Sequence, residues 1–211
     1  MARVHPELYV ILDRTAAGGR DLDTILADAI AGGCRMVQIR EKERPSGVLL
    51  PLARRLRDRC RRADVTFIVN DRIDLALAVE ADGVHLGQDD LPARIARPLL
   101  RPGMILGVST HSAAEARAAQ EDGADYVAVG SMFPTGTKAG FQLVGPGLIR
   151  NLRPEIRVPL IGIGGITVTN VGEVIRAGAD GVAVISAVCG AFDPEAATRR
   201  MLDEIRSARA S

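Results

Sequence analysis

The segments EADGVHLG (80–87), GADYVAVG (123–130) and GADGVAVI (178–185) repeat one pattern at three places along the chain. In each, the end of a helical pattern leads to an Asp and then to a short strand-like run rich in β-branched residues. Such joins are typical of loops that lead from a helix into the next strand of a parallel sheet, where a glycine can close the helix in a left-handed conformation. The repeat therefore predicts helices alternating with parallel strands.

Apolar periodicity extends this pattern over the whole chain. Short apolar runs predict eight strands, at residues 8–12, 35–39, 66–70, 83–86, 104–108, 126–130, 159–163 and 181–185. Amphipathic stretches between them predict helices that include residues 21–31, 46–62, 72–80, 112–122, 167–177 and 194–208. With no linker in the pattern, these units predict a compact α/β fold, a (β/α)8 TIM barrel in a single domain over residues 1–211. A doubly wound parallel sheet is the structural alternative.

Composition excludes several classes of protein. The 27 basic and 26 acidic residues nearly balance, so nothing favours a nucleic-acid partner or an acidic membrane. Cys34, Cys60 and Cys189 are an odd number without CxxC spacing, which argues against a disulfide framework or a zinc site and fits a reducing cytoplasm. No apolar run approaches the length of about 18 residues that a membrane span needs. We therefore expect a cytoplasmic protein that binds neither nucleic acid nor membrane.

Polar residues follow the predicted strands, whose carboxyl ends would share one mouth in a barrel. Gln38, Arg40 and Lys42 alternate at the end of the second run, so strand periodicity points their side chains the same way. The planar fork of Arg and the point charge of Lys suit an oxygen-rich anion such as diphosphate. A solvent-exposed strand end, with Glu41 balancing the charge, is the alternative.

Carboxylates follow the third and fourth runs. Asp71 and one of the pair Asp89 and Asp90 could meet across neighbouring loops. Mg²⁺ is typically held by one or two carboxylates together with substrate phosphates and water, so this pattern favours a magnesium site. Helix capping by Asp71 and turn formation by the other two are the alternatives.

The fifth run ends in Ser109, which could hydrogen-bond a substrate, and is followed by His111, whose role the sequence leaves open. Ser112 lies three residues before Glu115, a spacing that predicts a capping box at a helix start. No acid or nucleophile has the spacing of a Ser-His-Asp triad.

Phosphate-binding patterns follow the last three runs. PTGTK (134–138) carries hydroxyls and a lysine that could hold one phosphate or bridge two, although it lacks Walker spacing. Glycines 162, 164 and 165 follow the seventh run, and backbone amides follow the eighth, which is the recurrent phosphate site of TIM barrels. Helix packing is the alternative role of these glycines.

Taken in order, these motifs resemble the thiamine phosphate synthase family over nearly the whole chain. The matching segments are VQIREK (37–42), VND (69–71), DGVHLGQDD (82–90), LGVSTH (106–111), GSMFPTGTK (130–138), GIGGI (162–166) and GVAVISA (181–187). The resemblance implies a Mg²⁺-dependent transferase that joins 4-amino-2-methyl-5-hydroxymethylpyrimidine diphosphate to 4-methyl-5-hydroxyethylthiazole phosphate, or its carboxylated form, and releases diphosphate. A dissociative path through a pyrimidine cation is the implied mechanism.

The resemblance also implies site residues. Those expected to bind the pyrimidine diphosphate are Gln38, Arg40, Lys42, Asn70, Ser109 and Lys138. Those expected to hold the thiazole phosphate are Thr135, Thr137, Gly165, Ile185 and Ser186. Asp71 and Asp90 would be the magnesium ligands, because the HxGQxD pattern selects Asp90 over Asp89. Catalytic roles are expected for Arg40, Lys42, Ser109 and Lys138.

Two positions depart from the family pattern: Leu12 stands before Asp13 where Thr is more usual, and Ser131 replaces a common proline. Two other functions share parts of the pattern. A thiazole tautomerase-like isomerase would need the thiazole phosphate site but neither the metal nor the pyrimidine site, and a non-catalytic phosphate-binding barrel would need only the glycines. The expected partners are the two small-molecule substrates, and the sequence leaves open whether the chain forms a homo-oligomer.

Overall fold

Eight parallel strands close into a barrel in the order of the chain, from β1 beside β2 to β8 beside β1. The computed structural model describes residues 4–135 and 142–210. The strands are β1 Leu8–Asp13, β2 Met36–Arg40, β3 Thr66–Asn70, β4 Gly83–Leu86, β5 Ile105–Thr110, β6 Tyr126–Gly130, β7 Leu160–Ile163 and β8 Gly181–Val184. This arrangement confirms the TIM barrel and excludes the doubly wound sheet.

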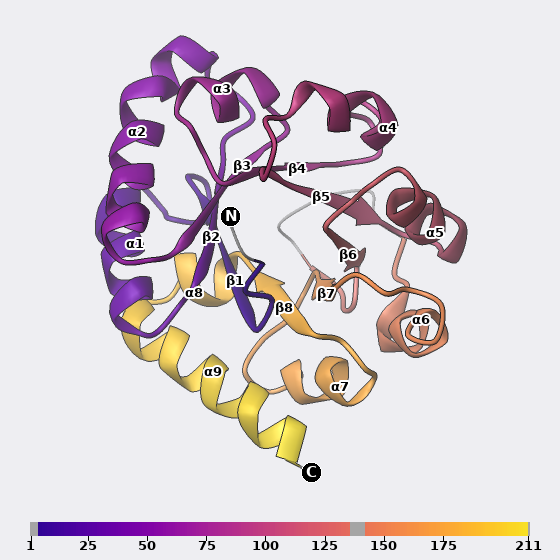
Figure 1. Ribbon diagram of the computed structural model, residues 1–211. Coiled ribbons are helices and arrows are strands. Elements are labelled where there is room, and N and C mark those ends of the chain that lie inside the picture. The colour runs from indigo at the N-terminus through magenta and orange to yellow at the C-terminus, as the bar shows by residue number, and fades with distance from the viewer. Residues whose placement is uncertain (1–3, 136–141, 211) are drawn as a thin grey trace.

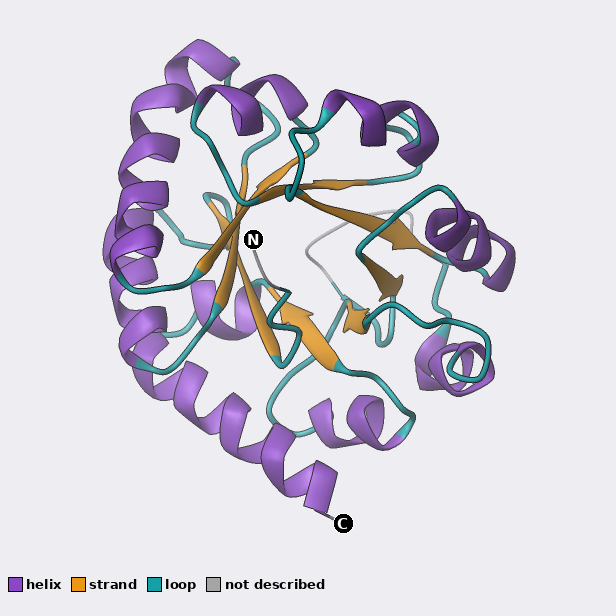
Figure 2. Ribbon diagram, in the orientation of Figure 1, coloured by secondary structure: helices purple, strands orange, loops and turns teal. Residues whose placement is uncertain are grey.

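Helices surround the strands on the outside (Figures 1 and 2). They are α1 Leu22–Ala31, α2 Ser46–Arg62, α3 Ile73–Ala78, α4 Ala93–Ala96, the 3-10 helix η1 Arg97–Leu99, α5 Ala113–Glu121, α6 Gly145–Leu152, α7 Val171–Arg176, α8 Ser186–Cys189 and α9 Pro194–Ala210. The sequence did not predict α4, α6 and α8. Two of them are a single turn long, and α6 begins within Gly145-Pro146-Gly147, a combination that ordinarily indicates a loop.

The repeated Asp of the opening pattern ties each of three strands to the strand before it. Its carboxylate accepts a hydrogen bond from a backbone N–H near the start of that preceding strand: Asp82 from Phe67 at 2.8 Å, Asp125 from Leu106 at 2.7 Å and Asp180 from Leu160 at 2.8 Å. The predicted left-handed helix ends occur at Gly123 (φ +89°) and Gly178 (φ +104°), whereas Glu80 takes this conformation in the first copy (φ +54°). The repeat is therefore a structural device of the barrel.

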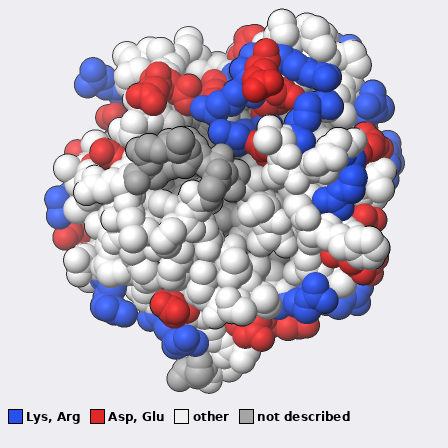
Figure 3. All heavy atoms as spheres, turned by 180° about the vertical axis from the view of Figure 1, so that it is seen from behind, with Lys and Arg blue, Asp and Glu red and all other residues white. Residues whose placement is uncertain are grey.

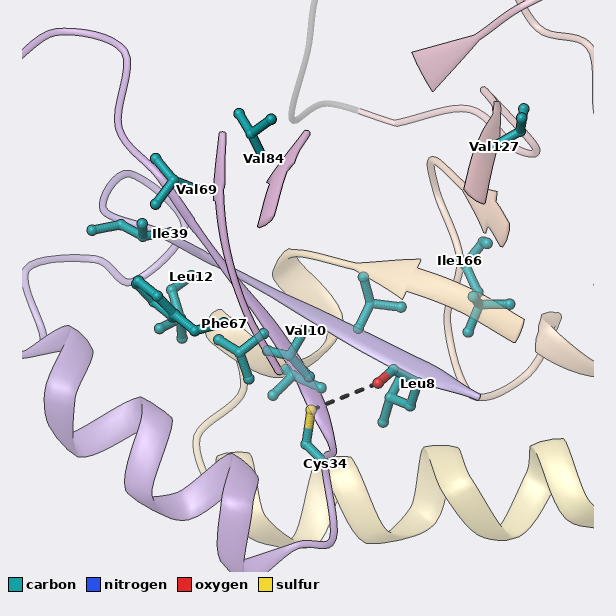
Figure 4. Close-up of a cluster of buried hydrophobic side chains, with 14 of the residues drawn as sticks. Leu8, Val10, Leu12, Cys34, Ile39, Phe67, Val69, Val84, Val127 and Ile166 are labelled. Atoms are coloured by element: carbon teal, nitrogen blue, oxygen red, sulfur yellow. Dashed lines mark hydrogen bonds between the residues drawn. The ribbon is translucent and has the colours of Figure 1, made fainter. Parts of the chain in front are cut away.

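The outer core lies between strands and helices and is built mainly from aliphatic side chains (Figure 4). Strand residues such as Val10, Leu12 and Phe67 are completely buried there. Cys34 lies against the same cluster, with its Sγ 3.7 Å from the carbonyl oxygen of Leu8, and burial raises the pKa of this thiol to about 11. All three cysteines are buried and free, as a structural role requires.

The inner core fills the barrel itself. Its buried members are Tyr9, Ile11, Met36, Ile68, Ile105, Tyr126, Ile161 and Ala183. Because side chains alternate along a strand, the next inward positions toward the carboxyl ends carry polar groups, which include Asp13, Arg40 and Ser109. The inward-facing side chains are therefore apolar in the middle of the barrel and polar at the carboxyl ends of the strands.

Candidate active site

A cavity of about 630 Å³ opens at the carboxyl ends of the strands, within the size range of small-molecule sites. Its walls come from β1, β2 and the strands and loops from β5 to β8. The described residues that line it are Asp13, Thr15, Ala16, Arg40, Ser109, Thr110, His111, Ala128, Gly130, Ser131, Pro134, Thr135, Ile163, Gly164, Gly165, Ile166, Thr167, Ala183, Val184, Ile185 and Ser186.

Arg40 ends β2 and is held by Asp13 at the end of β1. The two residues are register partners in the barrel, and Nη1 of Arg40 lies 2.5 Å from Oδ2 of Asp13. The second carboxylate oxygen of Asp13 accepts the backbone N–H of Ala16 at 3.0 Å. Asp13 is not among the site residues predicted from the sequence, because its pairing with Arg40 depends on the register between β1 and β2.

Lys42, Asp71 and Asp90 form a second charged group on the β2 to β4 side. Nζ of Lys42 lies 3.4 Å from Oδ2 of Asp71. Burial raises the pKa of Asp71, and the neighbouring Asp90 carboxyl raises it further, whereas Lys42 acts in the opposite direction. Asp71 also has a left-handed backbone (φ +60°), a strained conformation for a non-glycine residue that clusters at functional sites.

These two facing carboxylates fit a divalent cation, because a positive charge between them would offset their repulsion. One oxygen of Asp90 is already oriented, since Oδ2 accepts the backbone N–H of Gly87 at 2.7 Å. Within residues 4–135 and 142–210 there is no cluster of three or more metal-ligating side chains. Mg²⁺ is typically bound by one or two carboxylates together with oxygens of substrate and water, whereas a closed structural metal site takes all its ligands from the protein. Asp71 and Asp90 fit the first type.

Ser109, near the end of β5, joins the cavity to the barrel interior. Its Oγ lies 2.8 Å from Nε2 of His85, and its carbonyl oxygen accepts from Nε2 of Gln88 at 2.7 Å.

Gln38 is buried inside the barrel, where its Nε2 donates to the hydroxyl of Tyr9. Asn70 ends β3 as the register partner of His85. His85, Tyr9 and Tyr126 are not among the site residues predicted from the sequence; strand alternation places them inside the barrel, but it does not show which of them meet.

His111 has a capping role. Its backbone N–H donates to Oε2 of Glu115 at 2.7 Å, and its Nδ1 lies 3.3 Å from the same oxygen. Ser112 Oγ accepts the N–H of Glu115 at 3.2 Å, so the start of α5 is fixed from both sides. Ser112 is thus confirmed as the N-cap, whereas the reciprocal bond of the predicted capping box goes to the backbone N–H of His111 instead of that of Ser112.

The loops after β6, β7 and β8 build the opposite wall. Gly165 has φ +65°, and a Cβ on it would lie 2.5 Å from the carbonyl oxygen of Pro134, so only glycine fits. Asn170 braces this turn, because its Nδ2 donates to the carbonyl oxygen of Gly165 at 3.0 Å and its Oδ1 accepts the N–H of Thr167 at 2.8 Å. Ser186, which begins α8, lines the cavity together with these residues.

The predicted site residues thus fall into groups. Those that line the cavity are Arg40, Ser109, Thr135, Gly165, Ile185 and Ser186. Lys42, Asp71 and Asp90 form the charged group beside it. Gln38, buried inside the barrel, and Asn70, at the end of β3, do not line the cavity. Thr137 and Lys138 lie outside the described residues. The roles of all these residues stay predictions.

Charged side chains of both signs are mixed on the surface. In the view from behind, Lys and Arg lie beside Asp and Glu around the periphery, and much of the middle of the face is formed by uncharged residues (Figure 3). Among the described residues no helix has the length and apolar character needed to cross a bilayer.

Comparisons with known proteins match the whole length of the barrel. The family model described as thiamine monophosphate synthase matches residues 8–188. The thiamine-phosphate synthase of Moorella thermoacetica is 52% identical, with 96% of this chain and 97% of that protein covered. The thiamine-phosphate synthase of Methanospirillum hungatei is 49% identical, with 93% and 96% covered. The solved structure of thiamine phosphate pyrophosphorylase from Pyrococcus furiosus superimposes with a TM-score of 0.88 at 37% identity, with 96% of each chain covered.

Proposed function

Because the chain belongs to the thiamine monophosphate synthase family of transferases, we propose that it joins 4-amino-2-methyl-5-hydroxymethylpyrimidine diphosphate to 4-methyl-5-hydroxyethylthiazole phosphate, or to the carboxylated thiazole. The products are thiamine phosphate and diphosphate, together with CO2 when the thiazole is the carboxylated one. The observation that supports the proposal is a single cavity with the guanidinium of Arg40 on one wall and Gly165 with Ser186 on the other.

Arg40, Lys42 and Lys138 bind the diphosphate in this scheme. The ion pair with Asp13 fixes the guanidinium of Arg40 before substrate arrives, so little reorganisation is needed when negative charge grows on the leaving group. Lys42, which already faces Asp71, adds a second positive charge. Gln38, Asn70 and Ser109 bind the pyrimidine.

Asp71 and Asp90 would hold Mg²⁺, which when bound neutralises charge on the diphosphate and so favours its departure. Nζ of Lys42 lies close to the carboxylate of Asp71. The backbone N–H of Asp71 donates to the carbonyl oxygen of His85 at 2.8 Å, and the His85 side chain contacts Ser109, one of the residues proposed to bind the pyrimidine.

The thiazole phosphate occupies the wall formed by Thr135, Gly165, Ile185 and Ser186, with Thr137 as a further ligand. Glycine at position 165 lets phosphate oxygens approach the main chain, and backbone N–H groups after β8 can donate to them.

Bond formation follows a dissociative path in this proposal. The C–O bond to diphosphate breaks first, and the aminopyrimidine ring delocalises the positive charge left on its methylene carbon. The thiazole nitrogen then attacks that carbon. The cavity walls hold the two rings together and exclude water that would otherwise capture the cation, so no nucleophile of the protein is required.

The direct test supplies both substrates with Mg²⁺ and measures thiamine phosphate and diphosphate. Formation of both products in equal amounts supports the proposal. If no thiamine phosphate forms while the carboxylated thiazole is isomerised, the tautomerase-like function is correct, and if neither reaction occurs both enzymatic functions are refuted.

Asp71→Asn provides the matching variant. It should lower turnover by about 10²-fold or more, because the carboxylate pair is lost, and leave thermal unfolding nearly unchanged. Asp64→Asn makes the same chemical change on an exposed residue paired with Arg35, and it should leave turnover unchanged. Equal turnover in the two variants would refute the metal-binding role.

A further inference from the structure

A continuous run of hydrogen bonds crosses the barrel interior and ends at Ser109. Gln38 Nε2 lies 2.5 Å from the hydroxyl of Tyr9, which lies 3.0 Å from the hydroxyl of Tyr126. That hydroxyl lies 2.9 Å from Nδ1 of His85, whose Nε2 lies 2.8 Å from Ser109 Oγ. The five residues come from β2, β1, β6, β4 and β5, so the run connects strands that are not neighbours in the barrel.

The middle of this run is sealed from solvent. Tyr9 and Tyr126 are at most 1% exposed, and burial raises the pKa of both phenols, so they remain protonated donors. Their rings pack edge to face with centroids 5.8 Å apart, and His85 stacks on Tyr126 at 5.6 Å. Gly107 leaves space for the ring of Tyr126, because a Cβ at position 107 would lie 2.0 Å from Cζ of Tyr126.

One consistent assignment of donors and acceptors runs from Gln38 to Ser109. Gln38 Nε2 can only donate, so the oxygen of Tyr9 accepts from it, and in this assignment the single proton of Tyr9 is donated to Tyr126. Tyr126 in turn donates to Nδ1 of His85. A neutral imidazole that accepts at Nδ1 has its proton at Nε2, and this proton is donated to Ser109 Oγ. The hydroxyl proton of Ser109 is then directed to the cavity.

We propose that Tyr9, Tyr126 and His85 are positioning residues that hold the Ser109 hydroxyl as a donor toward the cavity, and thereby select a substrate ring that presents an acceptor there. Among the described residues, Ser109 lines the cavity and these three do not, so they act through Ser109. This role rests on the proposed function, in which the hydroxyl of Ser109 donates a hydrogen bond to a ring nitrogen of the pyrimidine.

The tautomer of His85 tests the direction without any substrate. Nitrogen-15 NMR of the imidazole groups, in mildly alkaline buffer, distinguishes a protonated from an unprotonated ring nitrogen, and a His85→Gln variant assigns the signals. We expect a protonated Nε2 and an unprotonated Nδ1 in the wild-type protein, and a mixture of tautomers in Tyr126→Phe. A protonated Nδ1 in the wild-type protein would overturn the proposal.

Kinetics test the consequence. Tyr126→Phe should raise the KM for pyrimidine diphosphate roughly tenfold, the effect of one lost hydrogen bond, and leave the KM for thiazole phosphate within about twofold. In a Ser109→Ala background the same change should have little further effect, because the two residues act as a unit. Full additivity, or equal effects on both substrates, would show a merely structural role and overturn the proposal.

Two controls separate the possible failures. Met36→Leu alters the same inner core without a polar group and should change neither KM selectively. If the wild-type protein makes no thiamine phosphate, the proposed function fails, whereas the NMR experiment still decides the direction of the hydrogen bonds.

Discussion

Replacing Asp13 by Asn tests how much of the activity depends on holding Arg40 in place. The Asn carbonyl can still accept the backbone N–H of Ala16, but its amide nitrogen would face Nη1 of Arg40 across a distance of 2.5 Å, donor against donor. The variant therefore removes one charged interaction while the shape of the side chain is kept.

The magnitude follows from the burial of the pair. The side chains of Asp13 and Arg40 are only 6% and 18% exposed, so solvent screens their interaction little. A hydrogen bond between charged groups contributes about 1.5–3 kcal/mol, so we expect the free energy of unfolding to fall by about 2 kcal/mol. For a chain of this length that corresponds to a Tm lower by about 4–8 °C. A guanidinium displaced by about 1 Å should lower turnover by about 10²-fold.

The assay combines steady-state turnover with thermal unfolding of the same preparations. Asp23→Asn is the matched control, because Asp23 forms a two-point ion pair with Arg59 in the helical layer and lines no part of the cavity. It should lower the Tm but leave turnover unchanged. If Asp13→Asn lowered the Tm and kept wild-type turnover, Arg40 would not need its partner, and the reasoning would be refuted.

Three other predictions concern the phosphate wall, pH and the metal. Gly165→Ala should raise the KM for thiazole phosphate by about tenfold or more, because the new methyl group would collide with the carbonyl of Pro134; unchanged kinetics would contradict this account. Arg59 lowers the pKa of Asp23, so the pair stabilises fully above the ordinary Asp value of about 4 and loses this contribution as pH falls through the lowered pKa. Urea midpoints of the wild-type protein and Asp23→Asn should therefore converge in acid, and a constant difference would refute the assignment. Chelation of divalent cations should abolish turnover and added Mg²⁺ should restore it, whereas full turnover in excess chelator would exclude the metal.

The fold and several of the residues that line the cavity could be predicted, because they depend on local sequence patterns. Strand alternation and the closure of parallel strands were enough to bring Arg40, Ser109 and Gly165 to one cavity. Short helices such as α8 escaped prediction because a single turn has no periodicity to detect.

The interior hydrogen bonds depend on information that a local pattern does not contain. Tyr9 and Tyr126 are 117 residues apart and meet only because β1 and β6 face each other across the barrel. The partner of Arg40 likewise depends on the register between β1 and β2, which pairs it with Asp13. Strand register and facing across a barrel emerge from the closed fold, so such partners become visible only in three dimensions.

The aspartates immediately before β4, β6 and β8 have a consequence for how the barrel assembles. Each reaches back to a backbone amide only 15, 19 or 20 residues earlier, so each closes a short loop at a small cost in chain entropy. Three strand-helix-strand units, β3 with β4, β5 with β6 and β7 with β8, can therefore gain a fixed register before the ends of the chain meet. Closure of β8 onto β1, which joins the two ends of the chain, then becomes the costly step, and the amides of Phe67, Leu106 and Leu160 are expected to be among the last to exchange with solvent.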